Sequence, residues 1–516
     1  MSRRGAIGVV IVVGWVVGLA VFARRELFRA PAQRLAEAGL RISPGASYFI
    51  VEQGGARVGF GSSTIDTVEN GLRVTDYLVA DLPIGGTTHR ATAQSVVRLS
   101  RALVLRDFLI SFESDSVPVS VHGRAHGDTL LEYVLSTEDA AADTQRVRLT
   151  APLLPPTLVP LAIALSERPQ VGKRYTFSTF DPMAMAPRDM SFTVRAESLF
   201  VVSDSAAFDA TARRWVAAHD DTVRAWHLAS EGGSFEGWVD EQGRLVEARQ
   251  SVGFTLRRTA YEMAFENWRS ARRATTNIPA ARDLHETTAI AASAPLGGRP
   301  LSRLRVRLGD VSHAGFDLAS NRQRMDGDTL TVRREPDASL EPSYRLPTPR
   351  ELRRRFGPEL AAAPLLERDH PAIRQLAERI ARSVADRSDP GQVARAINQW
   401  VHDSLRKTIT ISLPSAAQVL RARSGDCNEH TQLFLALARA TGIPARGSAG
   451  LALVDGKFYY HAWPEVYLGD WVAVDPTFGQ FPADAAHLRF VSGGIGRQAD
   501  LLRLMGQLRL EVLDAE

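Results

Sequence analysis

The hydrophobic pattern changes twice along the chain, and each stretch predicts a different kind of structure. Residues 5–23 carry no charged side chain and lie between the arginine pairs at 3–4 and 24–25. From about residue 47 to residue 268, short apolar runs alternate with polar positions, which is the period of β-strands. From about residue 370 onward, apolar residues recur every three or four positions, as in amphipathic helices. The pattern therefore predicts a multidomain chain.

The uncharged N-terminal run has the length of a membrane-spanning helix. Its 19 residues would extend about 28 Å as a helix, close to the ~30 Å hydrocarbon core of a bilayer. A cleaved signal peptide is the alternative, because residues 21–23 (VFA) resemble a cleavage site, although residues 24–25 (RR) would be an unusual mature start. We expect residues 1–29 to be a transmembrane helix that anchors the chain once in the cell (inner) membrane, with the soluble domains outside the cytoplasm.

Residues 30–270 are expected to form an antiparallel β-rich domain. Asn70-Gly71 between two apolar runs is a strong hairpin signal, and only residues 158–165 read as a helix. Many strands with few helices favour a sheet curled into a partial barrel or sandwich. The histidines here are scattered without metal-ligand spacing. We therefore expect a binding or spacer role, such as docking an envelope protein partner.

Residues 271–345 are expected to be a linker followed by a short β segment. The stretch 271–300 is rich in Ala, Thr, Pro and Gly and has no sustained period. Residues 304–332 return to a strand pattern around a turn at 326–328. The sequence leaves open whether this short segment joins the middle domain or leads the C-terminal one.

Residues 346–516 are expected to form an α+β domain whose helices begin at clear capping signals. Asp389 followed by Pro390 suits a helix cap and first turn. Ser415 with Gln418 three residues later is a capping box. Two helical stripes read as core faces: Ile373, Leu376, Ala377, Ile380 and Val384, then Val393, Ile397, Trp400, Val401 and Leu405.

Composition narrows the chemistry. The chain holds one cysteine among 516 residues, so no disulfide can form within it. Only three of the 62 basic residues are lysine, and no long basic block marks a nucleic-acid-binding arm. Nucleic acid is therefore not an expected partner, and the single thiol, Cys427, is either inert packing or reserved for chemistry.

The local sequence places Cys427 in the first turn of a helix. Gly425 and Asp426 form the turn into that helix, and Gly442 and Pro444 end it. Free backbone N–H groups and the positive end of the helix dipole lie at such a position, and both favour a thiolate. A cysteine used only for packing would fall more naturally on the buried face further along the helix.

Two predicted strands after this helix bring a histidine and an aspartate. His461 lies in the return strand of a hairpin, and Asp475 follows the next strand, so the sheet can place them side by side. A nucleophile, a base and an acid that orients the base are the parts that acyl transfer at cysteine requires. A metal site of Cys427, His430, His461 and Asp475 is the chemical alternative, but the spacing matches no common zinc pattern, and we expect no metal or other cofactor.

The segments GDCNEHTQLFLALARATGIPAR and HAWPEVYLGDWVAVDPTFGQ resemble the transglutaminase-like superfamily, relatives of papain-like cysteine proteases in catalytic geometry. The resemblance implies that Cys427 is the nucleophile, His461 the base and Asp475 the orienting acid. It also implies an oxyanion-binding group, for which Gln418 and Trp400 are candidates. Trp463 is expected to pack beside the triad, either in support of the site or as a purely structural aromatic.

The expected function is therefore a membrane-anchored cysteine acyl-transfer enzyme that acts on amide bonds of proteins or peptides through a thioester. It would be a cysteine protease or amidase, or a protein-glutamine transamidase, and the resemblance favours hydrolysis. The alternative is a catalytically inert envelope scaffold or binding protein that keeps the transglutaminase-like fold.

Overall fold

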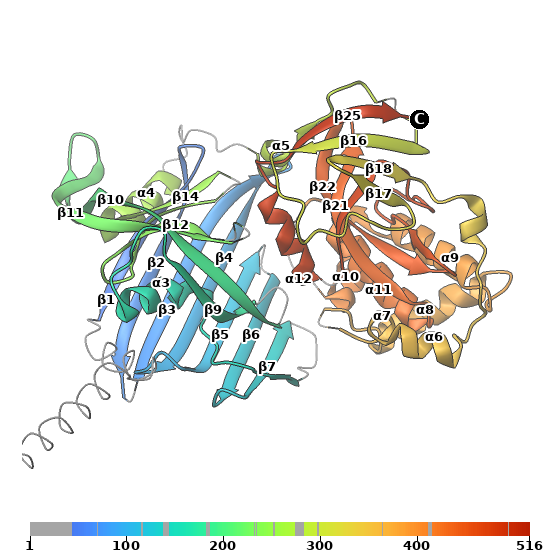
Figure 1. The fold of residues 1–516 in the computed structure, drawn as a ribbon, viewed down its shortest axis with the longest axis horizontal. Helices are drawn as coiled ribbons and strands as arrows, with labels where there is room; N and C mark the ends of the chain where they lie inside the picture. Colours follow the sequence, from blue (N-terminus) through green and yellow to red (C-terminus); the bar gives the residue numbers. More distant parts are fainter. Residues whose placement is uncertain are drawn as a thin grey trace, which may run out of the picture.

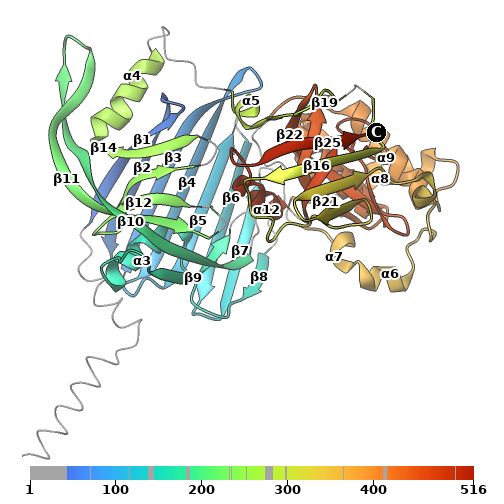
Figure 2. The same cartoon turned by 45° about the horizontal axis from the view of Figure 1, so that its top comes forward.

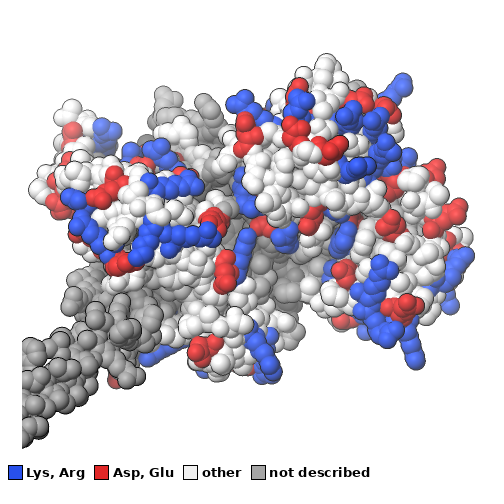
Figure 3. All heavy atoms as spheres, viewed as in Figure 1, with Lys and Arg blue, Asp and Glu red and all other residues white. Residues whose placement is uncertain are grey.

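The computed structural model describes residues 44–516 apart from positions 70, 115–116, 138–143, 182–185, 232, 234, 251–252, 274–282, 297–298, 364, 411–414 and 494. These residues form a large β-rich domain and a C-terminal domain of helices and smaller sheets (Figure 1). Basic and acidic side chains are interspersed over the face of the molecule that Figure 3 shows.

The predicted fold class needs a correction, because the transmembrane helix is not supported. Among the described residues, no helix is long and apolar enough to cross a membrane. The longest of them, α9 (Pro390–Ser404), has 15 residues; such a helix extends about 22 Å, short of the ~30 Å a bilayer core demands. The predicted span at 5–23 lies outside the described residues. The fold class is therefore an antiparallel β-rich region followed by a C-terminal domain with helices.

One antiparallel sheet of 14 strands makes up the β-rich domain. From β1 the chain builds outward to β8, and β14 to β9 continue on the other side, so β1 and β14 are neighbours inside the sheet. The strands are β1 (Gly45–Gln53), β2 (Ala56–Val68), β3 (Gly71–Ile84), β4 (Thr87–Ser100), β5 (Leu105–Ser114), β6 (Val117–His126), β7 (Leu130–Thr137), β8 (Thr144–Arg148), β9 (Arg174–Asp181), β10 (Ala186–Asp209), β11 (Arg214–Ser230), β12 (Glu236–Asp240), β13 (Leu245–Arg249) and β14 (Phe254–Thr259).

The sheet curls around a short apolar helix, α3 (Val159–Ser166) (Figures 1 and 2). Val159 and Ile163 of this helix share one core with Leu131 of β7 and Trp226 of β11, which are far apart in the sheet order. A helix that is hydrophobic all round must be buried on every side, and the inside of a curled sheet provides that. Two further helices, α4 (Asn267–Arg273) and α5 (Leu284–Thr288), lead towards the C-terminal domain.

A five-stranded sheet with helices packed on it forms the centre of the C-terminal domain. Its order is β15 (Ile290–Ala291), β22 (Lys457–Tyr467), β21 (Ala445–Val454) and β24 (His487–Ser492), with β23 (Trp471–Ala473) beside β22. Helix α11 (Cys427–Ala440) packs against β21 and β22 and against α8 (Pro371–Ser383), α9 and α10 (Ala416–Ala422). Helices α6 (Arg350–Arg355), α7 (Gly357–Leu360) and α12 (Ile495–Gln498) and the strand pair β19 (Arg406–Lys407) and β20 (Ser424–Gly425) complete the domain.

The predicted helix starts are confirmed. Asp389 accepts hydrogen bonds from the backbone N–H groups of Gly391 and Gln392, which caps α9. Ser415 and Gln418 form the reciprocal capping box of α10. These side chains satisfy backbone donors that a helix cannot pair within itself.

The short β segment belongs to the C-terminal domain. Strand β16 (Arg303–Gly309) lies between β18 (Thr329–Arg333) and β25 (Arg509–Ala515), and β17 (Gln323–Asp326) pairs with β18. Figures 1 and 2 both draw β25 beside β16. Because β16 and β25 are separated by some two hundred positions, no local pattern could have revealed the pairing.

The hairpin turn between β3 and β4 touches the C-terminal domain. The Gly86 N–H donates a hydrogen bond of 2.8 Å to Asp283 Oδ2. A Cβ at Gly85 would lie 2.6 Å from Ile409 Cδ1, so the turn packs directly against Ile409. The two domains therefore meet near the segment that precedes α10.

The spacing of β21 and β24 leads to a first prediction. A Cβ on Gly450 of β21 would lie 2.0 Å from the Leu488 carbonyl oxygen, whereas one on Gly309 of β16 would have no atom nearer than 3.7 Å. We expect Gly450→Ala to lower the thermal unfolding midpoint, with a destabilisation of about 1–3 kcal/mol as for other overpacked sites. Gly309→Ala is the matched control and should leave the midpoint unchanged. Calorimetric unfolding measures both, and equal midpoints would contradict the close approach.

Candidate active site

Cys427 is the first residue of α11, as the sequence predicts. Asp426 caps the helix by accepting from Asn428 N–H at 2.8 Å, and Glu429 in turn accepts from Asp426 N–H at 2.9 Å. The Glu429 side chain covers Gly425 so closely that a Cβ there would lie 2.3 Å from it. The motif Gly-Asp-Cys-x-Glu therefore forms the turn that places the thiol at the helix start. Glycine is needed at position 425 because the Glu429 side chain packs against its Cα.

The surroundings of Cys427 favour the neutral thiol. Its side chain is half-buried against the core formed by β21, β22 and β24. Burial raises the pKa of the Cys427 thiol well above its usual range, and the carboxylates of Asp426, Glu429 and Asp475 add to the rise. A hydrogen bond from the Ala462 backbone acts in the opposite direction and is too weak to reverse it. The net effect is the opposite of the thiolate preference expected from the helix dipole.

His461 and Asp475 lie side by side, as predicted from the strand order. The His461 Nε2–H donates to Asp475 Oδ2 at 2.7 Å, and only 8% of His461 is exposed. His461 comes from β22 and directly precedes Ala462, whose backbone reaches the thiol of Cys427. Because Nε2 carries the proton bound to Asp475, Nδ1 is the ring nitrogen of neutral His461 left as a base.

Asp475 is a fully buried carboxylate with several hydrogen-bond donors. Its Oδ1 accepts from the backbone N–H groups of Thr477 at 2.7 Å and Phe478 at 3.1 Å. Its Oδ2 accepts from His461 and also from His487 Nε2, at 2.9 Å. Burial alone would raise the pKa of Asp475, but the charges and hydrogen bonds of the two histidines hold it well below its usual range.

His487 is the functional residue that the sequence reasoning missed. It begins β24, is 1% exposed, and bridges two carboxylates: Nε2 faces Asp475, and Nδ1 lies 2.9 Å from Asp484 Oδ1. Burial alone would lower the pKa of His487, but its hydrogen bonds to Asp475 and Asp484 and their charges raise it to about 9. His487 is therefore a buried imidazolium at neutral pH. Nothing in the sequence near His487 signals this role.

A buried ion pair from the short β segment supports the loop that carries these residues. Arg322 and Glu335 lie 3.1 Å apart and are both almost fully buried. Glu335 accepts from the Ala473 N–H at 2.9 Å, two residues before Asp475. Arg322 donates to the Asp484 carbonyl oxygen at 2.5 Å. The segment that the sequence left unassigned therefore holds both ends of the Asp475–Asp484 loop.

Aromatic rings enclose the His461 imidazole. Phe478 lies flat on it, with ring centroids 4.6 Å apart and planes 1° apart, and is 37% exposed. Trp463 lies behind, with its centroid 6.0 Å from that of His461, and is fully buried. The structure thus places Trp463 beside the predicted triad and adds Phe478 as the cover on the solvent side.

The other candidate residues lie in structural contacts. The Gln418 side-chain oxygen accepts from Ser415 N–H at 2.8 Å in the cap of α10, which gives that oxygen a structural role. Trp400 stacks under Arg423, with 4.5 Å from the guanidinium carbon to the ring centroid. His430 Nδ1 donates to the Asp426 carbonyl oxygen at 2.7 Å, which turns it towards the helix cap.

Three of the buried side chains could in principle share a metal ion. Ligand atoms of His461, Asp475 and His487 lie within 4.8 Å of one another. Zinc ligands in tetrahedral geometry are held about 3.4 Å apart by metal–ligand bonds of ~2.0–2.2 Å. The N···O separations here are 2.7 and 2.9 Å, which are the distances of hydrogen bonds with a shared proton.

Residues 374–476 match the sequence model of the transglutaminase-like superfamily. The chain contains a transglutaminase-like domain. The match includes Cys427, His461 and Asp475, whereas the supporting residues Arg322, Glu335 and His487 lie outside it. No curated protein matches the chain.

Two solved structures show distant similarity to the chain that carries this transglutaminase-like domain. A candidate cysteine protease of Cytophaga hutchinsonii has 15% identity over 44% of this chain and 89% of its own, with a TM-score of 0.30. A β-barrel-like protein of the domain of unknown function DUF1849 from Brucella abortus has 14% identity over 42% of this chain and 96% of its own, with a TM-score of 0.27. Both TM-scores are too low to indicate a shared overall fold.

The charge on His487 predicts a pH dependence of the transglutaminase-like domain. A histidine whose pKa is ~6.5 in the unfolded chain and higher in the folded protein stabilises the fold fully below pH ~6.5. That stabilisation is lost as the pH rises through the folded-state pKa. With a folded pKa of about 9, His487 should make the thermal midpoint fall steadily between neutral pH and pH 9.

His487→Gln tests this interpretation. We expect a lower midpoint at pH 7, because Asp475 and Asp484 lose the cation between them, and a flatter decline towards pH 9. His122→Gln, an exposed histidine of β6, is the control and should follow the parent curve. Thermal unfolding across the pH range measures the slopes; parallel curves for His487→Gln and the parent would contradict a buried imidazolium.

The acidic neighbours of Cys427 predict how its reactivity can be raised. Asp426 and Glu429 are linked through the capping box. Burial raises the pKa of Asp426 and the charge of Glu429 adds to the rise, so both acidic groups must be removed together. The double variant Asp426→Asn/Glu429→Gln keeps residue types that suit both cap positions. We expect its Cys427 to react with iodoacetamide several-fold faster at pH 7.5 than the parent thiol, because a lower pKa gives more thiolate.

Glu378→Gln on the exposed face of α8 is the control for removing an acidic charge elsewhere. It should leave the alkylation rate of Cys427 unchanged. Mass spectrometry of the single cysteine gives the rates directly. An unchanged or slower alkylation rate in the double variant would contradict the interpretation that the acidic neighbours raise the pKa of Cys427.

Proposed function

We propose that the transglutaminase-like domain is a cysteine acyl-transfer enzyme that cleaves amide bonds in proteins or peptides. The observation that carries the proposal is the contact between the thiol of Cys427 and the backbone beside His461, combined with the hydrogen bond that fixes His461 on Asp475. This arrangement suits attack on a carbonyl carbon. It has a nucleophile at a helix start, a base in the residue next to the backbone that contacts the thiol, and a buried acid that orients the base.

The protonation states define the order of events. Because the pKa of the Cys427 thiol is raised, attack begins from the neutral thiol, and His461 Nδ1 takes the proton as the S–C bond forms. Asp475 then stabilises the imidazolium of His461 through the Nε2–H bond. The imidazolium returns its proton to the departing amine, and a thioester remains on Cys427.

The helix start supplies a group for the developing oxyanion. The backbone N–H of Cys427 occupies the first position of α11, where no intrahelical acceptor exists. Such a donor, together with the positive end of the helix dipole, stabilises the negative oxygen of the tetrahedral intermediate. The Gln418 side-chain oxygen is held in the cap of α10, so its NH₂ group stays the candidate for a second donor to the oxyanion.

We favour water as the acceptor of the acyl group, which makes the reaction a hydrolysis. A depression of about 340 Å³ is lined by Gln480, Leu453 and Arg299 among others, and also by Phe478, which stacks on the His461 imidazole. Its mixed polarity suits one side chain of an extended peptide. Transamidation by an amine remains the second outcome for the same thioester and is separated by experiment.

One observation favours the alternative of an inert binding protein. A thiol whose pKa is raised and which lies beside three carboxylates is a poor resting nucleophile. In an enzyme, His461 acting as general base would remove the thiol proton during the attack, so a low thiol pKa is not required. A protein in which His461 does not act in this way would use the fold for binding alone. Activity that depends on His461 therefore separates the two functions.

The test uses the full chain with a peptide library in the presence of a biotinylated primary amine. New peptide termini report hydrolysis, and biotinylated peptides report transamidation. We expect cleavage that is abolished in Cys427→Ala and lowered about 10²–10⁴-fold in His461→Ala. Asp475→Asn should fall in the same range, because His461 would lose its orienting acid.

His122→Gln is the control for loss of an imidazole outside the site and should retain parent activity. Circular dichroism of each variant separates lost chemistry from lost folding. Products that are identical for the parent and Cys427→Ala would refute the enzyme and leave the binding protein.

A further inference from the structure

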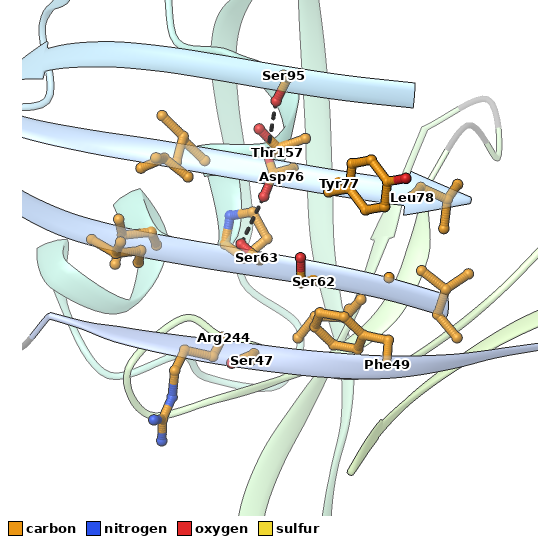
Figure 4. A pocket seen from close by; sticks show the side chains of 18 of the residues that line it. Ser47, Phe49, Ser62, Ser63, Asp76, Tyr77, Leu78, Ser95, Thr157 and Arg244 are labelled. Atoms are coloured by element: carbon orange, nitrogen blue, oxygen red, sulfur yellow. Dashed lines mark hydrogen bonds between the residues drawn. The ribbon is translucent and has the colours of Figure 1, made fainter. Parts of the chain in front are cut away.

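A second cavity lies inside the β-rich domain (Figure 4). Helix α11, which begins at Cys427, lies in the other domain (Figure 1). It has a volume of about 390 Å³ and lies between the inner face of β1–β5 and the segment that starts α3. Phe49, Ile65, Val74 and Leu161 contribute to its mainly apolar wall. Cavities of ~300–1,000 Å³ with apolar walls and a few polar groups are typical of small-molecule sites.

One polar row crosses this apolar surface. Ser47, Ser63, Asp76 and Ser95 are direct partners on the neighbouring strands β1, β2, β3 and β4, and all four line the cavity. Side chains at paired positions point to the same face of a sheet, so the four form a line perpendicular to the strands. An aligned polar row in an otherwise hydrophobic wall is a specific feature that a core built only for packing does not need.

The rows on either side are apolar. One neighbouring row lies two residues along each strand from the polar row. It consists of Phe49, Gly61, Leu78 and Ala93, which are again direct partners. In the other direction lie Gly45, Ile65, Val74 and Val97. On this face of β1–β4 the polar side chains therefore form a single stripe between two apolar rows, and the polar part of a ligand that fills the cavity can meet that stripe.

Asp76 is the charged group of the row. Ser63 Oγ–H donates to its Oδ1 at 2.7 Å, and Ser95 Oγ–H donates to its Oδ2 at 3.0 Å (Figure 4). A carboxylate offers about four acceptor sites, so two remain for a ligand. Among the residues that the structure describes, no cation pairs with Asp76, and the guanidinium of Arg244, which also lines the cavity, is bound to Asp240 at 2.9 Å.

We propose that this cavity binds an amphipathic molecule with one apolar chain and a protonated amine, the chain filling the apolar wall and the amine contacting Asp76. Charge complementarity decides the polar end. Ser63 and Ser95 already donate to the carboxylate, so the cavity presents the remaining acceptor sites of Asp76. A cation satisfies that face with charge-assisted hydrogen bonds, whereas an anion would be repelled. The proposal is independent of the chemistry of Cys427.

The test is a calorimetric titration of the full chain at pH 7, free of detergent, with three probes of equal chain length. Dodecylamine carries a cation, dodecanol a neutral hydroxyl and dodecanoate an anion. We expect dodecylamine to bind at least tenfold more tightly than dodecanol, and dodecanoate to bind most weakly. This ranking needs no variant and therefore tests the proposal even if substitutions disturb folding.

Two variants locate the site and its charge. Asp76→Asn should abolish the preference for the amine while dodecanol still binds, and Asp66→Asn, an exposed carboxyl on β2, should retain the parent ranking. Ala93→Phe should fill the cavity and weaken all three probes. Equal affinity for amine and alcohol, tighter binding of dodecanoate, no binding at all, or a preference that survives Asp76→Asn would each overturn the proposal.

Discussion

The shared carboxylate of Asp475 is the interaction on which the rest of the candidate active site depends. An ionised carboxylate removed from water costs several kcal/mol unless it is fully compensated. Two backbone N–H groups and two imidazoles provide that compensation on its two oxygens. The orientation of His461, and through it the base available to Cys427, follows from this single buried anion.

The charges alternate outward from this centre. His461 and Asp475 are followed by the imidazolium of His487 and the carboxylate of Asp484. Beyond them, Arg322 and Glu335 hold the backbone at both ends of the loop. A buried network of this kind rigidifies a site when every member is paired. The short β segment, which in sequence resembles an appendage, is therefore structurally part of the transglutaminase-like domain.

Local signals predicted the parts of the site that local geometry builds. The Gly425-Asp426 turn, the helix stop and the capping pairs at Asp389 and Ser415 are all formed within a few residues. His487 and Arg322 could not be predicted, because their roles arise only when distant strands meet. The same limit applies to Asp76: alternation assigns its face of the strand, but only the register reveals that it faces two serines.

The pairing of β16 with β25 has a consequence for how such a domain can be inherited. A segment cut at the limits of the recognised match, 374–476, would carry all three residues of the expected triad. It would lack His487, the Arg322–Glu335 pair and both strands of that pairing. The unit that recombination could move between proteins without loss is therefore larger than the recognisable motif, and it is assembled from chain on both sides of it.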